Sequence, residues 1–302
     1  MAIPHKPEFA GVVAIMPTPF LEDGSLDLDS IQVLCDVYIE RGVNGLAILG
    51  VMGEAQKLLP DERAQVIETY VRCAAGRVPV VAGTSHQGTH PAIALALQAE
   101  RLGCAGIMVA PPPVPAARVD DLVFDHYRSI HNAVSVPMVV QDHLASSGVL
   151  MSPQLLARLS AELERAGYLK LEDPPTPAKA DQIRYLAGGR PRIFGGLGGL
   201  YFFEELEHGA AGTMTGFAFP EILVRIYDAY RSGDTEGAAS VFYRYLPAIR
   251  FEFQPEIALT LRKETLYRRG WLRTPALRAP ATPLNAPSSR DLENLLARLD
   301  LL

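Results

Sequence analysis

Residues 167–175 read GYLKLEDPP: an apolar run of strand length with a lysine inside it, then two carboxylates and a Pro-Pro stop. An ammonium group that loses its hydration inside a strand costs several kcal/mol unless it is paired. A neutral amine avoids this cost and is a nucleophile for a carbonyl carbon. Lys170 is therefore a candidate catalytic residue. The alternative, an edge-strand lysine whose side chain reaches water, stays open on this stretch alone.

Seven further apolar runs of strand length lie around this one in the chain. They are continuous rather than alternating, which is typical of parallel strands covered on both faces. Segments with a helical period separate them, and Ser152-Pro153 and Thr176-Pro177 each predict an N-cap followed by proline. The eight β-then-α units predict a (β/α)8 TIM barrel over residues 1–220. The expected strands are residues 11–16, 45–49, 78–82, 106–110, 136–140, 167–171, 192–194 and 212–217.

The main alternative is a doubly wound sheet, which would place a glycine-rich phosphate turn after the first strand. Residues 16–20 read MPTPF and are not such a turn. After Pro220 the strand signals stop, so residues 221–302 are expected to form a C-terminal helical region. Its predicted helices are residues 221–231, 235–248, 256–269 and 290–301, with a loop rich in proline and alanine at 274–289.

Composition narrows the class of protein. The chain has 302 residues, of which 48% are hydrophobic and 21% charged, as in a globular protein. A net charge of -6 argues against nucleic acid as a partner, because no basic surplus neutralises phosphates. No apolar run is long enough to span a membrane, and residues 1–9 lack a signal-peptide core, so a cytoplasmic location is expected. Cys35, Cys73 and Cys104 are odd in number and far apart, which favours buried free thiols.

In a TIM barrel the active site lies at the carboxyl ends of the strands, which places Lys170 near the catalytic mouth. It is the only lysine in any of the eight runs. Glu172 has the same strand parity, so both side chains can face inward. Glu172 could move protons directly, orient another group or cap the following turn. Asp173, before two prolines, is expected to be a turn residue.

Other polar groups are expected at the same end of the barrel. Backbone N–H groups of the loop Gly50–Glu54, at Met52 and Gly53, could hold a carboxylate, although a plain turn is the alternative. His86 and His143 could act as acid or base, or be rim histidines bonded to the backbone. The spacing of the acidic and histidine residues matches no metal motif, so we expect neither a metal nor another cofactor.

Several of these motifs resemble the dihydrodipicolinate synthase and N-acetylneuraminate lyase superfamily of class I Schiff-base aldolases. The likeness covers essentially the whole chain and rests on PTPF at 17–20, GVMGE at 50–54, AGT at 82–84, Leu169-Lys170, Gly195-Gly196 and residues 209–215. It implies an imine between Lys170 and a 2-oxo acid, a carboxylate bound at the Gly50–Glu54 loop, no cofactor, and a homotetramer.

The chain also departs from the family pattern. The usual loop GTTGE has lost both threonines, as Val51 and Met52, and the proton-shuttling tyrosine of the fifth strand is replaced by Gln141. The tyrosine of the fourth strand falls at Pro113, and the arginine that synthases place after the fifth strand falls at Ser146. A glutamine cannot titrate, so the usual proton relay is absent, which argues against dihydrodipicolinate synthase activity.

A closer likeness is to 2-keto-3-deoxy-L-arabinonate dehydratases. It rests on VQD at 140–142, Ala145-Ser146, Lys170-x-Glu172 and AGTMTG at 211–216, while the loop at 196–199 differs. It implies dehydration of a 2-keto-3-deoxy sugar acid, with Lys170 and Glu172 catalytic. The alternatives are a pyruvate-dependent aldolase or synthase, and a non-catalytic 2-oxo acid binder. The expected substrate-binding residues are Met52, Gly53, Gln141, Gly196 and Thr213.

Overall fold

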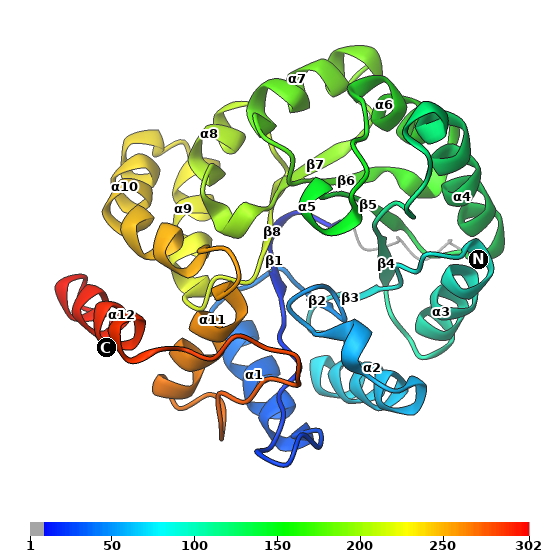
Figure 1. The fold of residues 1–302 in the computed structure, drawn as a ribbon. Coiled ribbons are helices and arrows are strands. Elements are labelled where there is room, and N and C mark those ends of the chain that lie inside the picture. The colour runs from blue at the N-terminus through cyan, green and yellow to red at the C-terminus, as the bar shows by residue number, and fades with distance from the viewer. Residues whose placement is uncertain (1–8, 302) are drawn as a thin grey trace.

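The computed structural model describes residues 9–301, and its central feature is a closed barrel of eight parallel strands paired in the order β1 to β8 (Figure 1). The predicted TIM barrel is therefore confirmed. Every strand overlaps the run from which it was predicted. The strands are β1 Gly11–Ile15, β2 Gly45–Ile48, β3 Val80–Gly83, β4 Gly106–Val109, β5 Met138–Asp142, β6 Tyr168–Leu171, β7 Arg192–Gly195 and β8 Gly212–Thr215.

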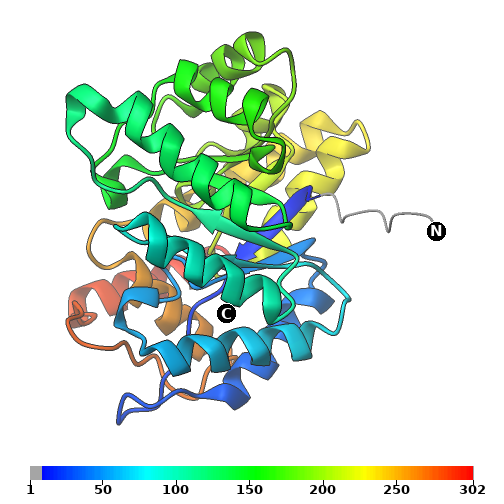
Figure 2. The same ribbon diagram turned by 90° about the vertical axis from the view of Figure 1, so that its right-hand side faces the viewer.

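Helices surround the strands on the outside (Figures 1 and 2). The first eight are α1 Leu28–Glu40, α2 Pro60–Ala74, α3 Thr89–Arg101, α4 Val119–Ala133, α5 Leu144–Ser147, α6 Pro153–Glu162, α7 Thr176–Leu186 and α8 Phe202–Glu207. Ser152 caps α6 as predicted, because its hydroxyl accepts from Leu155 N at 3.1 Å. The prediction for Thr176 was wrong: Pro175 is the N-cap of α7, and the Thr176 hydroxyl donates to Glu205 Oε1 at 2.7 Å.

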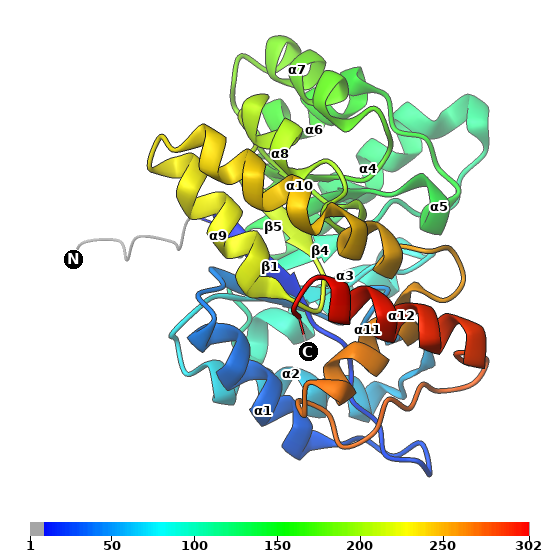
Figure 3. The same ribbon diagram turned by 90° about the vertical axis from the view of Figure 1, so that its left-hand side faces the viewer.

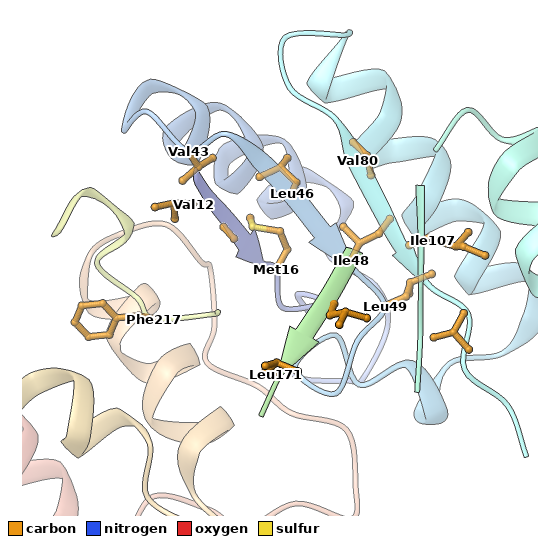
Figure 4. Packing of buried hydrophobic residues seen from close by; sticks show 14 of the residues in the cluster. Val12, Met16, Val43, Leu46, Ile48, Leu49, Val80, Ile107, Leu171 and Phe217 are labelled. Carbon is orange, nitrogen blue, oxygen red and sulfur yellow. The ribbon is translucent and has the colours of Figure 1, made fainter. Parts of the chain in front are cut away.

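Two hydrophobic clusters form the core. The larger lies between the strands and the helices, and Figure 4 shows part of it around Leu46, Ile48 and Ile107. The smaller fills the barrel interior with side chains of opposite parity, including Ile15, Val139 and Met214. Because parallel strands present alternate residues to these two clusters, the apolar runs are continuous in sequence.

The helical region predicted for residues 221–302 adjoins the barrel closely. It consists of α9 Pro220–Arg231, α10 Thr235–Glu252, α11 Ala258–Arg268 and α12 Ala286–Arg298. Helix α9 packs on β1, and α10 contacts α8, α9, α11 and α12 (Figures 1 and 3). The loop expected at 274–289 ends earlier than predicted, since the Asn285 side chain caps α12 by accepting from Ser288 N.

Two further expectations concern the cysteines and the membrane. Cys35, Cys73 and Cys104 are free and buried, which confirms the prediction. None of the helices in residues 9–301 has the length and apolar character to cross a membrane. Residues 1–8, on which most of the signal-peptide prediction rests, lie outside the described residues.

Candidate active site

Lys170 lies in β6 with its side chain inside the barrel. The strand register pairs it with Gln141 of β5 on one side and Phe194 of β7 on the other. Lys170 is 4% exposed and lines a cavity of ≈ 550 Å³ at the carboxyl ends of the strands. The prediction that this lysine faces the mouth of the barrel rather than an outer edge is confirmed.

One carboxylate oxygen, Glu172 Oε2, contacts both Lys170 and Gln141 at the carboxyl ends of β5 and β6. Glu172 Oε2 lies 2.9 Å from Lys170 Nζ and accepts a hydrogen bond from Gln141 Nε2 at 2.8 Å. The backbone explains the alignment, because Glu172 N donates to Asp142 O at 2.8 Å and so extends the β5–β6 ladder. Strand parity then places Lys170 and Glu172 on the same face, as the sequence predicted.

Glu172 occupies space that is left free because the residue directly after β7 is a glycine, Gly196. A Cβ atom at Gly196 would lie 2.3 Å from Glu172 Cγ, which is closer than atoms can approach. Gly196 therefore makes room for Glu172 rather than lining the cavity, whose wall at this loop is formed by Leu197 and Gly198. Gly196 was predicted to bind substrate, but it does not line the cavity and it contacts Glu172 instead.

The electrostatics of the site favour an ionised Glu172. Burial raises the pKa of this carboxyl, but the Lys170 ammonium, His143 and the Gln141 amide oppose burial, so the pKa lies below its usual value. Burial lowers the pKa of His143. His143 lines the same cavity, and its Nδ1 lies 2.8 Å from Ser146 Oγ. His86 is placed differently: its Nδ1 accepts from Gly88 N, and it lines a neighbouring cavity of ≈ 580 Å³.

The loop Gly50–Glu54 presents only part of the expected carboxylate cradle. Met52 lines the cavity, and its amide has no acceptor among the described residues. Gly53 does not line the cavity. Its N–H donates to Gly50 O at 3.0 Å and its carbonyl accepts from Thr18 Oγ1 at 2.7 Å. The Gly53 amide closes the turn and is not free to hold a carboxylate, which corrects the prediction for this residue.

Thr213 is also displaced from its expected role. In β8 the interior position belongs to Met214, so Thr213 has the opposite parity and lies outside the cavity lining. Its hydroxyl contacts Gly195 O at 3.4 Å. Thr215 has the same parity as Thr213 but is the last residue of β8, and it does line the cavity.

The sequence analysis missed a buried network that supports the Gly50–Glu54 loop. Glu54 Oε1 pairs with Lys263 Nζ of α11 at 2.7 Å, and Oε2 lies 3.0 Å from Lys57 Nζ and accepts from Arg278 N. The Lys263 side chain is fully buried, which lowers its pKa to about 8 against the opposing effect of Glu54. The only sequence signal was a lysine within an amphipathic helix. This network ties the loop to the C-terminal region.

A second missed group supports the carboxyl end of β5. Lys179 of α7 is buried, and its Nζ lies 2.6 Å from Asp142 Oδ2 and 2.9 Å from Asp173 Oδ2. Asp173, predicted to be a turn residue, thus links the turn after β6 to α7. Burial raises the pKa of Asp142 to about 6, while Lys179 opposes the rise. This ion-pair cluster fixes the segment that carries Gln141.

The cavity is completed by the C-terminal region. Its wall there comes from residues 253–262, that is Phe253, Gln254, Pro255, Glu256, Ala258, Leu259 and Arg262. Most of the remaining wall is apolar and includes Ile15, Met108 and Met214. The cavity is therefore suited to a small organic molecule between an apolar floor and the polar group of Lys170, Glu172 and Gln141. Among the described residues no cluster of His, Cys, Asp and Glu could hold a metal ion.

Comparison with known proteins agrees with this geometry. The Dihydrodipicolinate synthetase family matches residues 8–299. An L-2-keto-3-deoxyarabonate dehydratase of Azospirillum brasilense is 33% identical over 100% of this chain and 98% of its own length. A 4-hydroxy-tetrahydrodipicolinate synthase of Pelobacter propionicus is 32% identical over 76% of this chain and 78% of its own. The crystal structure of a dihydrodipicolinate synthase of Rhodopseudomonas palustris superposes with a TM-score of 0.91 at 34% identity, covering 96% of this chain and 97% of that one. The chain belongs to the dihydrodipicolinate synthetase family.

Proposed function

We propose that this lyase dehydrates a 2-keto-3-deoxy sugar acid through an imine on Lys170. The observation that carries the proposal is the shared contact at Glu172 Oε2, which receives both Lys170 Nζ and Gln141 Nε2. Glu172 is the only titratable partner of Lys170 Nζ among residues 9–301. With glutamine where the family has a tyrosine, this carboxylate is the group placed to move protons.

The reaction follows from these contacts. Lys170 passes a proton to Glu172, and the neutral amine attacks the C2 carbonyl carbon of the substrate. Glu172 returns this proton to the hydroxyl of the carbinolamine, which leaves as water, and the protonated imine forms. The iminium withdraws electrons, so Glu172 takes the proton from C3 and an enamine forms. The enamine expels the C4 hydroxyl, which leaves as water with the proton that Glu172 returns. Hydrolysis of the remaining imine releases the 2-oxo product and regenerates Lys170.

Two other parts of the cavity support binding. The Met52 amide, free of an acceptor among the described residues, is suited to the substrate carboxylate. Gln141 donates to Glu172 and holds it in an accepting orientation beside Lys170. The likeness to the Azospirillum brasilense dehydratase over the full chain supports the same reaction.

A pyruvate-dependent aldolase or synthase is the second candidate. It is favoured by the synthases among the relatives, such as that of Pelobacter propionicus. The non-titratable Gln141 counts against it, because a phenol is absent where the family's relay needs one. A non-catalytic binder of 2-oxo acids is a third candidate, which would bind the acid without turning it over.

Two assays separate these candidates. Borohydride reduction with pyruvate traps an imine as a stable adduct on the lysine that forms it. An adduct on Lys170 supports an imine-forming enzyme, and the absence of an adduct would contradict the imine mechanism. Assays of a panel of 2-keto-3-deoxy sugar acids then compare water loss with pyruvate release. Loss of water without pyruvate supports the dehydratase, whereas release of pyruvate identifies an aldolase.

The family also implies a homotetramer, which remains a prediction for this chain. Sedimentation-equilibrium mass would test it directly. A mass of four chains supports the tetramer, and a mass of one or two chains contradicts it.

A further inference from the structure

Helix α11 of the C-terminal region carries a charged side chain into the wall of the cavity that contains Lys170. Arg262 lines this cavity although it lies more than 200 residues from the Gly50–Glu54 loop in sequence. It is 5% exposed, so its guanidinium has left bulk water. A guanidinium keeps its charge in proteins, and burying it is favourable only where its donors find acceptors.

The described residues provide few acceptors for this guanidinium. Arg262 Nη1 donates to Met52 Sδ, and a thioether is a weak acceptor. Arg262 Nε is buried without a hydrogen bond, and its nearest carboxylate oxygen, Glu252 Oε2, lies 3.8 Å away. No acceptor lies at Nη2 among residues 9–301. An arginine with most of its donors unused beside a cavity indicates a ligand that supplies the missing acceptors.

Glu252 does not cancel the charge of this guanidinium. Its Oε2 already accepts from Ala218 N at 3.0 Å. Burial raises the pKa of Glu252 to about 7, while Arg262 opposes the rise, so near neutral pH this carboxyl is only partly ionised. The pair therefore retains a net positive charge at the cavity wall, which favours an anionic ligand.

The contact between Arg262 and Met52 indicates which group of a ligand Arg262 would bind. Its contact with Met52 Sδ places the guanidinium against the side chain of a residue whose own amide has no acceptor among the described residues. The same loop offers no hydroxyl to an anion, because its middle positions are Val51 and Met52. A planar guanidinium and a free backbone N–H from residues that line the same cavity can together hold a carboxylate.

We propose that Arg262 binds the carboxylate of the substrate together with the Met52 amide. The inference rests on the proposed 2-oxo acid substrate and adds a specific residue from the C-terminal helices to it. The barrel and the C-terminal helices would thus bind two neighbouring groups of the substrate, its carbonyl and its carboxylate. Lys170 bonds to the carbonyl carbon, and Arg262 holds the adjacent carboxylate.

The test compares a charged and a neutral ligand. Borohydride trapping is measured against concentration for pyruvate and for pyruvamide, its uncharged amide, with wild-type protein and with Arg262→Gln. We expect Arg262→Gln to raise the half-saturating pyruvate concentration about 10- to 100-fold, the range for a lost charge-assisted hydrogen bond. The value for pyruvamide should change less than about 3-fold, because no charged hydrogen bond is lost.

Glu252→Gln is the matched control, since it alters the other member of the pair and keeps Arg262. It should leave the half-saturating pyruvate concentration unchanged or lower it. The proposal is wrong if Arg262→Gln weakens both ligands equally, or leaves pyruvate unaffected, or if Glu252→Gln weakens pyruvate as much as Arg262→Gln does. Equal losses would assign Arg262 a purely structural role.

Two further measurements keep the inference testable if trapping or folding fails. If the wild-type protein gives no adduct, the imine mechanism is wrong. Pyruvate binding to both proteins by saturation-transfer NMR then decides the role of Arg262, which requires weaker binding by Arg262→Gln. If Arg262→Gln does not fold, Arg262→Lys keeps the charge but loses the planar fork. This variant should weaken pyruvate selectively, and equal weakening of pyruvamide would contradict the proposal.

Discussion

Three buried lysines with carboxylate partners lie among residues 9–301, namely Lys170, Lys179 and Lys263. The surroundings of Lys170 and Lys263 differ most. Among residues 9–301 Lys170 has one ion-pair partner, Glu172 at 2.9 Å, and it lines a cavity. Lys263 lies 2.7 Å from Glu54, donates to Ala276 O, and its Nζ lies 4.5 Å from the centre of the Phe20 ring. A buried lysine is therefore not by itself a sign of catalysis. The free space beside the amine and the small number of its partners mark Lys170 as the reactive one.

The two lysine groups also have different roles and come from different parts of the chain. The Lys170 group lies on adjacent strands, β5 and β6, where register and parity fix its geometry. The Lys263 group joins a loop after β2 to α11 and holds that loop in place. Substitutions at the first group should change the chemistry, and substitutions at the second should change the free energy of unfolding.

The largest effect is expected for Glu172→Gln. Loss of the carboxylate removes the proposed proton carrier and should lower turnover about 10²- to 10⁴-fold. The imine on Lys170 should still form, so borohydride trapping with pyruvate should persist. Asp173→Asn is the control, because Asp173 pairs with Lys179 and not with Lys170, and it should keep most of its turnover. Full turnover by Glu172→Gln would refute the assignment of this residue.

The next largest effect is on the free energy of unfolding and concerns Lys263. Lys263→Met leaves the buried Glu54 without its fully buried partner and should lower the free energy of unfolding by about 3–5 kcal/mol. Lys57→Met is the control, because the Lys57 side chain is 26% exposed, and it should cost less than about 1 kcal/mol. Urea unfolding of both variants measures the difference. Similar losses in the two variants would show that the Lys263 pair is not the main support of the loop.

Gly196→Ala tests how closely Glu172 is positioned. The added Cβ would meet Glu172 Cγ at 2.3 Å, so the carboxylate must move away from Lys170 Nζ. A displacement of about 1 Å at a reacting group can cost about 10²-fold in rate, and this is the expected loss of turnover. In Gly167→Ala the nearest atom lies 3.7 Å from the new Cβ, so turnover should be unchanged. Equal turnover in both variants would remove Gly196 from the mechanism.

The smallest effect concerns Glu205, a buried carboxyl with no cationic partner in the part of the chain that the structure describes. Burial raises the pKa of Glu205 to about 8, although a hydrogen bond from Thr176 opposes the rise. The folded protein then holds a proton between the ordinary pKa and about 8 that the unfolded chain has released. Stability should therefore fall as the pH rises through this window, by about 1 kcal/mol per pH unit.

Glu205→Gln should remove this dependence, since an amide does not titrate. Urea unfolding midpoints at pH 5.5, 6.5 and 7.5 would show a flatter profile for the variant than for wild type. Parallel profiles would mean that Glu205 is ionised in the folded state. The result would also sharpen the contrast with Glu172, whose pKa is lowered because Lys170 lies beside it.

Much of the barrel could be predicted from the sequence because its signals are local. Continuous apolar runs identified all eight strands, and Lys170 was found because a charge inside such a run is rare. Gln141 and Glu172 followed from the strand ends. Thr213 was expected to bind substrate but does not line the cavity, whereas Met214 and the strand-end residue Thr215 do. Gly53 was expected to bind a carboxylate, but its amide donates to Gly50 O within the tight turn.

The missed residues act over distances that sequence spacing does not reveal. Glu54 and Lys263 are 209 residues apart, and Met52 and Arg262 are 210 residues apart. Nothing in the sequence of α11 indicates that one face meets the Gly50–Glu54 loop. Only the packing of the C-terminal helices against the barrel places Arg262 in the cavity wall. Such contacts depend on tertiary structure and not on any local pattern.

The most direct test of the central claim is the site of borohydride trapping. Wild-type protein is reduced with borohydride in the presence of pyruvate and then digested. The mass of each lysine-containing peptide is measured by mass spectrometry. The account predicts a single adduct, on Lys170, and none on Lys263, which is buried but does not line the cavity. An adduct on Lys263 or another lysine, or no adduct at all, would contradict it.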